Sequence, residues 1–185
     1  MGWNDVERVN GEEKEKIPYT KFEGSTVIRV IDKEPYSFWS HWLPKQNTGV
    51  TCPGKGCPIC SVMAEQRASN LPKTYNSTQR HAVRIWNYDT NQMEIMIQGK
   101  TFFSQLLTFH REIGDLTGYD LKVIRKGSGK DTTYTLIPQP AKDFDFGDKI
   151  VDVDYAELFK APDTETIVQL MEGKTWDEIN GANEA

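Results

Sequence analysis

Three cysteines gathered within nine residues constrain this chain more than any other feature of its sequence. Cys52, Cys57 and Cys60 are spaced as C-x4-C-x2-C, and they are the only cysteines among 185 residues. An odd number of cysteines confined to one short loop indicates a metal site rather than a disulfide framework. The Pro and Gly residues between them turn the chain, so that the sulfur atoms can point at one ion, about 2.3 Å away in the case of zinc.

A tetrahedral site needs a fourth ligand, and the chain has three histidines to offer. His41 lies eleven residues before Cys52, near the end of an expected strand, and is the first candidate. His81, at the start of the next strand, and His110, on an expected helix, are the alternatives. The residues therefore predict one bound metal ion, which we expect to be Zn²⁺.

We predict that this metal is structural rather than catalytic. Zinc deaminases carry His-x-Glu before Pro-Cys-x-x-Cys, whereas here His110-Arg111-Glu112 follows the cysteines and Gly56 precedes Cys57. The sequence also has no His-Glu-x-x-His pair, Walker loop or Gly-x-Ser-x-Gly elbow. We therefore expect a protein that is not an enzyme.

Charge divides the chain into three predicted regions. Residues 143–185 hold 12 acidic and 3 basic residues, a net charge of −9, whereas residues 21–142 have a net charge of +6. We expect a charged leader over 1–20, a body over 21–142 with a metal subdomain at about 41–70, and an acidic C-terminal tail over 143–185. A basic body with an acidic tail is one way to bind a polyanion while a competing segment stays in reserve.

The hydrophobic pattern predicts a mainly β fold. Runs rich in β-branched and aromatic residues predict strands over 24–31, 35–43, 80–88, 93–98, 121–126 and 132–137. Helices are expected over 59–69, 101–113 and 164–171, and the metal loop over 48–60. These elements suit a small antiparallel barrel like the oligonucleotide-binding (OB) fold, with an inserted zinc-binding loop and one or two short helices. Thr175 and Glu178 fit a capping box in the acidic tail.

Aromatic and basic residues alternate with apolar ones along the third expected strand. Its apolar face suits a core, and its other face carries Arg80, Arg84, Trp86 and Tyr88. The second hairpin adds Lys122, Arg125, Lys126 and Tyr134. Single-stranded nucleic acid needs cations for its phosphates and rings for its bases, so these eight residues are the predicted contacts. The alternative is that Trp86 and Tyr88 simply cover the second face of the barrel.

Four segments together resemble a known family. The strand Tyr36–Leu43, the loop Cys52–Cys60, the helix after Gly99-Lys100 and the hairpin turn Gly127–Thr135 look like those of the T4-type helix-destabilising proteins, which are phage single-stranded DNA-binding proteins. The resemblance covers roughly Lys21–Pro140. It implies an OB fold with a zinc subdomain, a groove of aromatic and basic residues, and a tail that recruits replication partners. It also implies the metal ligands His41, Cys52, Cys57 and Cys60.

The resulting expectation is a protein that coats single-stranded DNA during phage replication, repair and recombination, in the cytoplasm of the infected host. Its acidic tail would bind phage replication proteins, such as polymerase, primase or helicase, or recombination factors, and no association with a membrane is expected. Three alternatives stay open: a zinc-containing adaptor that docks replication proteins, a protein that binds single-stranded RNA, and a zinc-dependent nucleic-acid enzyme.

Overall fold

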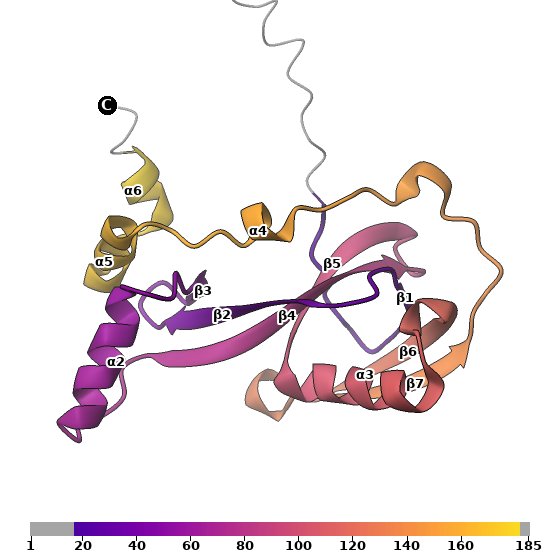
Figure 1. Cartoon of the computed structure of the whole chain (residues 1–185), viewed down its shortest axis with the longest axis horizontal. Helices are drawn as coiled ribbons and strands as arrows, with labels where there is room; N and C mark the ends of the chain where they lie inside the picture. The colour runs from indigo at the N-terminus through magenta and orange to yellow at the C-terminus, as the bar shows by residue number, and fades with distance from the viewer. Residues whose placement is uncertain (1–16, 182–185) are drawn as a thin grey trace, which may run out of the picture.

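A computed structural model describes residues 17–181 (Figure 1). Within this range one antiparallel sheet has the strand order β3-β2-β4-β1-β6-β7, and β5 pairs with β4. The strands are β1 (Ser25–Val30), β2 (Tyr36–Leu43), β3 (Thr48–Thr51), β4 (Asn76–Asn87), β5 (Gln92–Gly99), β6 (Tyr119–Lys126) and β7 (Thr133–Pro140).

The mainly β class is confirmed. A closed barrel is not, because no pairing closes the sheet among these residues. Most of the predicted leader, residues 1–16, lies outside the described range.

All six predicted strands are present, and one further strand lies inside the segment expected to be a loop. This strand, β3, pairs with β2 through the register His41 with Val50. Thr48, Val50 and Thr51 are β-branched, and Asn47 takes the left-handed conformation (φ 51°) that closes a tight turn between the two strands. The four-residue strand is short enough to be hidden by the glycines and prolines around it.

The helices are α2 (Pro58–Ala68), α3 (Lys100–Ile113), α4 (Tyr155–Leu158), α5 (Thr164–Glu172) and α6 (Trp176–Gly181). Short 3-10 turns cover Leu116–Gly118, Gly129–Asp131 and Gly147–Lys149. Helix α3 ends before Gly114 (φ 89°), as the sequence predicted. The capping box also forms, since Glu178 accepts from the Thr175 amide at 2.7 Å and Thr175 Oγ1 accepts from the Glu178 amide at 3.3 Å.

The main core lies between α3 and one face of the sheet (Figure 1). Val83 and Ile85 of β4 point into it, as their alternation predicted, and Phe102 and Leu106 of α3 cover them. The other members of this core are Phe22, Ile28, Val30, Met96, Leu121, Val123 and Leu136.

The opposite face of the sheet is covered by residues 141–159, which we call the strap (Figure 1, upper part of the molecule). Trp86 is only 1% exposed, and the rings of Phe144 and Phe146 each lie 5.4 Å from it. Further along, Phe159 stacks on Phe38 at 4.4 Å with an interplanar angle of 13°. The face of β4 that the sequence predicted to be an outer surface is therefore covered, and Trp86 is a core residue of the second face.

The strap begins at a buried ion pair. Arg29 Nε lies 2.7 Å from Asp120 Oδ1, and both side chains are buried. Asp120 also accepts from the Lys142 amide at 2.9 Å, and Arg29 donates to the Lys142 carbonyl at 2.8 Å. Because each charge finds a partner, this pair can stay buried at little net cost and fixes where the chain leaves β7.

The acidic C-terminal region is built into the fold. Ile167 and Leu170 of α5 and Ile179 of α6 are buried in a second core around the cysteine loop. Their partners in this core are Leu43, Val50, Cys57, Ile59 and Tyr75. The amphipathic helices predicted in this region therefore place their apolar faces against the protein itself.

Leu170→Ala should lower the free energy of unfolding by about 2–5 kcal/mol, because it removes a fully buried side chain from a packed core. Val168→Ala, on the exposed face of the same helix (39% exposed), is the matched control and should change it by less than about 0.5 kcal/mol. Denaturant unfolding followed by circular dichroism measures both. Equal, small effects would show that α5 does not contribute to the fold.

Candidate metal centre and nucleic-acid groove

The three thiols and one imidazole predicted to bind metal converge on one point. His41 Nε2 lies 3.5 Å from Cys57 Sγ and 3.4 Å from Cys60 Sγ, and Cys52 Sγ lies 3.7 Å from Cys60 Sγ. All four ligand atoms lie within 4.8 Å of one another. These four residues can therefore hold one metal ion.

The spacing fits a tetrahedral ion of the size of zinc. An ion about 2.3 Å from each sulfur and about 2.0–2.1 Å from the nitrogen would hold sulfur atoms about 3.8 Å apart, and nitrogen and sulfur about 3.5–3.6 Å apart. The observed separations of 3.7, 3.5 and 3.4 Å are close to these values. A disulfide would need sulfur atoms about 2.05 Å apart, and all three cysteines are free.

Two strands, a turn and a helix bring the ligands together. His41 is buried on β2, and Cys52 directly follows β3, its partner strand. Gly54 and Gly56 both have a φ of 80°, a conformation that glycine adopts without strain, and they reverse the chain after Cys52. Cys57 is the N-cap residue of α2, so the helix sets the direction of the last two thiols.

Burial disfavours the charged forms of three of the ligands, Cys52, Cys60 and His41, on their own. It raises the pKa of Cys60 to about 12 and also raises the pKa of Cys52, whereas it lowers the pKa of His41. Thiolates and a neutral imidazole are the forms that bind metal, so metal binding would release protons from the thiols and would weaken as the pH falls.

The two alternative histidines lie away from the cysteines. His81 sits in an open groove on β4, where its Nδ1 lies 2.7 Å from Ser37 Oγ, and His110 is exposed in the last turn of α3. His41 is therefore the histidine that completes the cluster.

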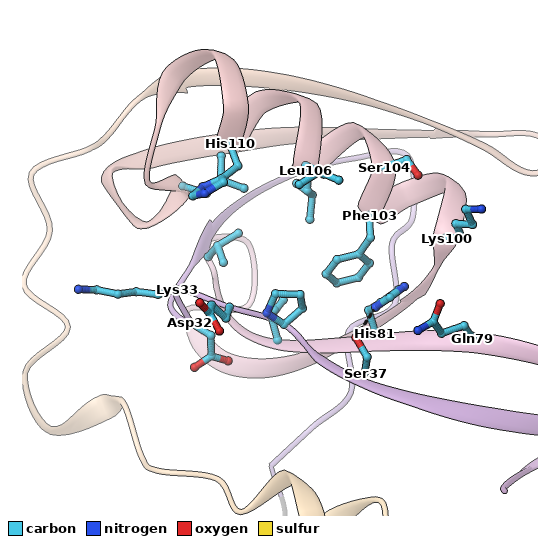
Figure 2. A pocket seen from close by; sticks show the side chains of 16 residues that line it. Asp32, Lys33, Ser37, Gln79, His81, Lys100, Phe103, Ser104, Leu106 and His110 are labelled. Atoms are coloured by element: carbon cyan, nitrogen blue, oxygen red, sulfur yellow. Dashed lines mark hydrogen bonds between the residues drawn. The ribbon is translucent and has the colours of Figure 1, made fainter. Parts of the chain in front are cut away.

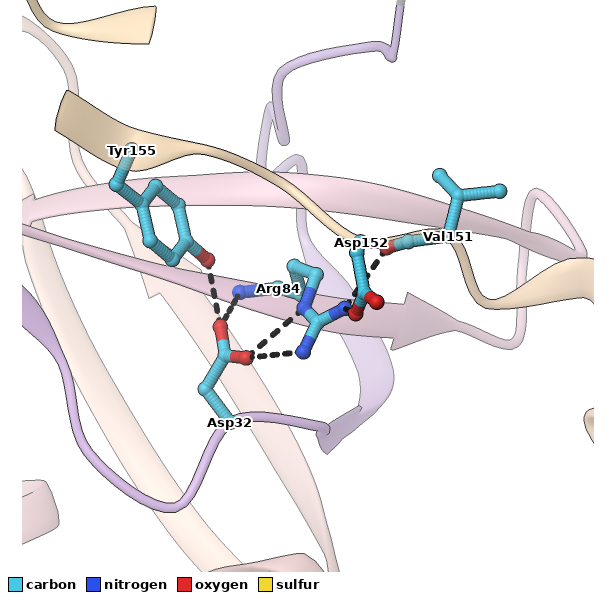
Figure 3. Close-up of polar contacts among 5 residues, drawn as sticks. All are labelled: Asp32, Arg84, Val151, Asp152 and Tyr155. Atoms are coloured by element: carbon cyan, nitrogen blue, oxygen red, sulfur yellow. Dashed lines mark hydrogen bonds and ion pairs between the residues drawn. The ribbon is translucent and has the colours of Figure 1, made fainter. Parts of the chain in front are cut away.

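Arg84, a predicted nucleic-acid contact, is paired inside the protein (Figure 3). Its guanidinium lies 2.8 Å from Asp32 and 3.0 Å from Asp152, and it donates to the Val151 carbonyl at 2.8 Å. The Tyr155 hydroxyl donates to the same Asp32 carboxylate at 2.5 Å, and burial together with that carboxylate raises the pKa of Tyr155. This network fastens the middle of the strap to the sheet.

Tyr88 is also held by the protein. Its hydroxyl donates to Asp120 at 3.0 Å, and the Lys142 ammonium lies 4.2 Å from the centre of its ring. Burial and the hydrogen bond to Asp120 raise the pKa of Tyr88 to about 12. With Trp86 buried, three of the eight predicted contacts are thus covered by the strap or its first residues.

The other five predicted contacts are divided between the two faces of the sheet. Arg80 and Lys122 are half-buried on different strands, and Lys126 is exposed at the end of β6. Arg125 points to the opposite side of β6 from Lys122 and Lys126, because side chains alternate along a strand. The Tyr134 ring packs against the main core, 5.4 Å from Phe102.

An open groove of about 420 Å³ lies elsewhere, between α3 and the chain that connects β1 to β2 (Figure 2). Its apolar wall comes from Phe103, Leu106 and Leu107 of α3. The His81 ring contacts the Phe103 ring, with the two ring centres 4.9 Å apart, and burial lowers the pKa of His81.

Basic side chains surround this groove. Lys33, Lys100 and His110 line it together with His81. Lys33 and Lys100 are exposed, so their charges face solvent. Two carboxylates also line the groove: Asp32, which is paired with Arg84, and Glu34, which is exposed. The groove therefore combines an aromatic wall with exposed cations.

Trp39 extends the aromatic surface beyond the groove. It lies two residues from Ser37 on the same side of β2, and its partner on β4 is the groove residue Gln79. Trp39 is 53% exposed.

The sequence left open which face of this strand belongs to the core, and it did not predict Phe103 or Lys100 as ligand contacts. The available signal was the exposed Leu107 one turn after the half-buried Phe103, beside the main core face of α3.

No protein family, curated protein or solved structure matches the chain when each is compared with it. Among residues 17–181 no helix has the length and apolar character that crossing a bilayer requires.

His41→Ala should abolish stable binding of one metal ion per chain, because it removes the only nitrogen in the four-atom cluster. His110→Ala should leave the metal content unchanged, since this side chain is exposed on α3. Elemental analysis of the purified chains, and the absorption spectrum after Co²⁺ substitution, report on both. Full metal content in His41→Ala with an unaltered Co²⁺ spectrum would contradict the ligand assignment.

Proposed function

We propose that this chain is a non-enzymatic protein that binds single-stranded DNA without sequence specificity, in the groove beside α3. The observation that supports the proposal best is the combination of the Phe103 ring, the exposed Trp39 indole and the exposed Lys33 and Lys100 ammonium groups along one surface. Each base stacked on an aromatic side chain contributes about 1–3 kcal/mol, and the cations track the phosphates. Neither contact reads the identity of a base.

The start of α3 adds to the favourable field. Gly99 is its N-cap residue and offers no side-chain cap, and the first turn carries no acidic residue. The positive end of the helix dipole therefore lies beside Lys100, where a phosphate would be attracted. An open, curved relative of the OB barrel would present its ligand along such a surface, and the open sheet is compatible with that proposal.

The ion in the His41–Cys60 cluster is proposed to be a structural Zn²⁺. When bound, it supplies positive charge that holds three thiolates together and ties the loop to β2. His41, Cys52, Cys57 and Cys60 would hold it. The protein's own part is to set the direction of the ligands, through the β2–β3 pair and the start of α2.

The proposal also includes the biological process in which the protein acts. The resemblance to T4-type proteins supports a role in phage replication, repair and recombination in the host cytoplasm. Replication proteins would then meet the outward faces of the acidic region, since its apolar faces are used internally. The strap pairs Asp152 with Arg84 and covers Trp86 with aromatic rings, which supports the groove, with its open basic and aromatic lining, as the binding surface.

Titration with oligo(dT) should quench the tryptophan fluorescence, and Trp39→Phe should remove most of the quenching, because Trp39 is exposed beside the groove. Trp86→Phe is the matched control and should keep the quenching, since Trp86 is buried under the strap. Quenching lost only in Trp86→Phe would instead place the ligand on the strap side of the sheet.

Phe103→Ala should weaken oligo(dT) binding by about 1–3 kcal/mol, roughly 5-fold to 150-fold in affinity, through loss of stacking. Lys100→Gln should weaken binding and reduce its dependence on salt concentration, because one phosphate contact is lost. Lys160→Gln is a control on the far acidic region, where Lys160 pairs with Glu157. Fluorescence anisotropy at several salt concentrations measures all three.

The same assay separates DNA binding from two of the alternatives. Duplex DNA should bind more weakly than oligo(dT), since paired bases cannot stack on protein rings. Tighter binding of oligo(U) than of oligo(dT) would favour an RNA-binding protein. No binding of either strand at low salt by the metal-loaded chain would favour the adaptor.

A further inference from the structure

The C-terminal helices α5 and α6 pack against the metal subdomain. Ile167 and Leu170 of α5 are fully buried in the second core. The residues of that core outside the C-terminal helices come from β2, β3, the cysteine loop, α2 and the start of β4, namely Leu43, Val50, Cys57, Ile59 and Tyr75. Among residues 17–181, this core shares no residue with the main core under α3.

The turn between β2 and β3 also caps the end of α5. Gln46 Nε2 donates to the Leu170 carbonyl at 2.6 Å and to the Lys174 carbonyl at 3.1 Å. Lys45 Nζ donates to the carbonyls of Met171 and Glu172, both at 3.3 Å. The last carbonyls of a helix have no partner within it and carry partial negative charge, so these donors stabilise the end of α5.

Several of the residues that hold α5 lie close to a metal ligand in the chain. His41 precedes Leu43 by two residues and pairs with Val50 across the hairpin. Ile59 lies between Cys57 and Cys60 on the first turn of α2. A metal ion at this point would fix the β2–β3 hairpin and α2 relative to each other, and these two elements form the surface on which α5 packs.

We propose that the metal centre is a latch for the C-terminal helices. With metal bound, the hairpin and α2 present a fixed apolar surface, and α5 and α6 dock on it. Loss of the metal lets this surface come apart, so the helices detach while the sheet and α3 stay folded around their own core. This inference does not depend on DNA binding, and it makes the position of the acidic region depend on metal.

Hydrogen exchange on the full chain tests the latch. The zinc-loaded protein is compared with protein stripped by a chelator under reducing conditions. Amides of α5 should exchange at least about tenfold faster without metal, while amides of β1, β4 and β6 in the main core should change by less than about twofold. Unchanged protection of α5 in metal-free protein would overturn the proposal. So would a loss of protection in the main core together with α5, because the metal would then hold the whole fold.

A variant that leaves the ligands untouched gives a second test. Lys45→Ala/Gln46→Ala removes the donors to the end of α5 and should speed exchange in α5, with one zinc ion per chain retained. Lys160→Ala, which removes an exposed lysine of the surface pair with Glu157, is the control and should leave α5 protected. Protection of α5 in the double variant equal to that in the control would show that the hairpin turn has no part in holding the helix.

Discussion

Both faces of strand β4 have to be covered, and the rest of the structure follows from this constraint. The strand has twelve residues, pairs with β2, β1 and β5, and carries Val83 and Ile85 on one face and Ala82 and Trp86 on the other. Helix α3 covers the first face and the strap covers the second. Because these layers bury the middle of the sheet, the open groove lies at the edge of α3, where the helix no longer fills the space.

The sequence predicted the local features of the fold well, because each depends on residues close together in the chain. The alternation of Val83 and Ile85, the end of α3 at Gly114 and the Thr175–Glu178 capping box all formed as expected. The four metal ligands also came together, since three of them lie within nine residues.

What the sequence could not predict depends on distant partners. The Tyr155 hydroxyl donates to the carboxylate of Asp32, 123 residues away in the chain, and no local sequence pattern predicts such a contact. A Trp and a Tyr that follow two arginines on one face of a strand suit a stacking surface or a second core equally well, and the positions of Phe144 and Phe146 decide for Trp86. The same holds for charge: Arg84 and Lys100 look alike in sequence, yet one is neutralised by Asp32 and the other faces solvent.

The fastening of the strap also has a consequence for the order of folding. Its contacts with Arg84 and Asp32 join residues 67 to 123 positions apart, whereas the β4–β5 and β6–β7 hairpins close over short loops. Loop closure costs more entropy as the separation grows, so the strap is expected to close after both hairpins and α3 have formed. Contacts made after the transition state slow unfolding more than they speed folding. The strap therefore acts mainly on the lifetime of the folded protein.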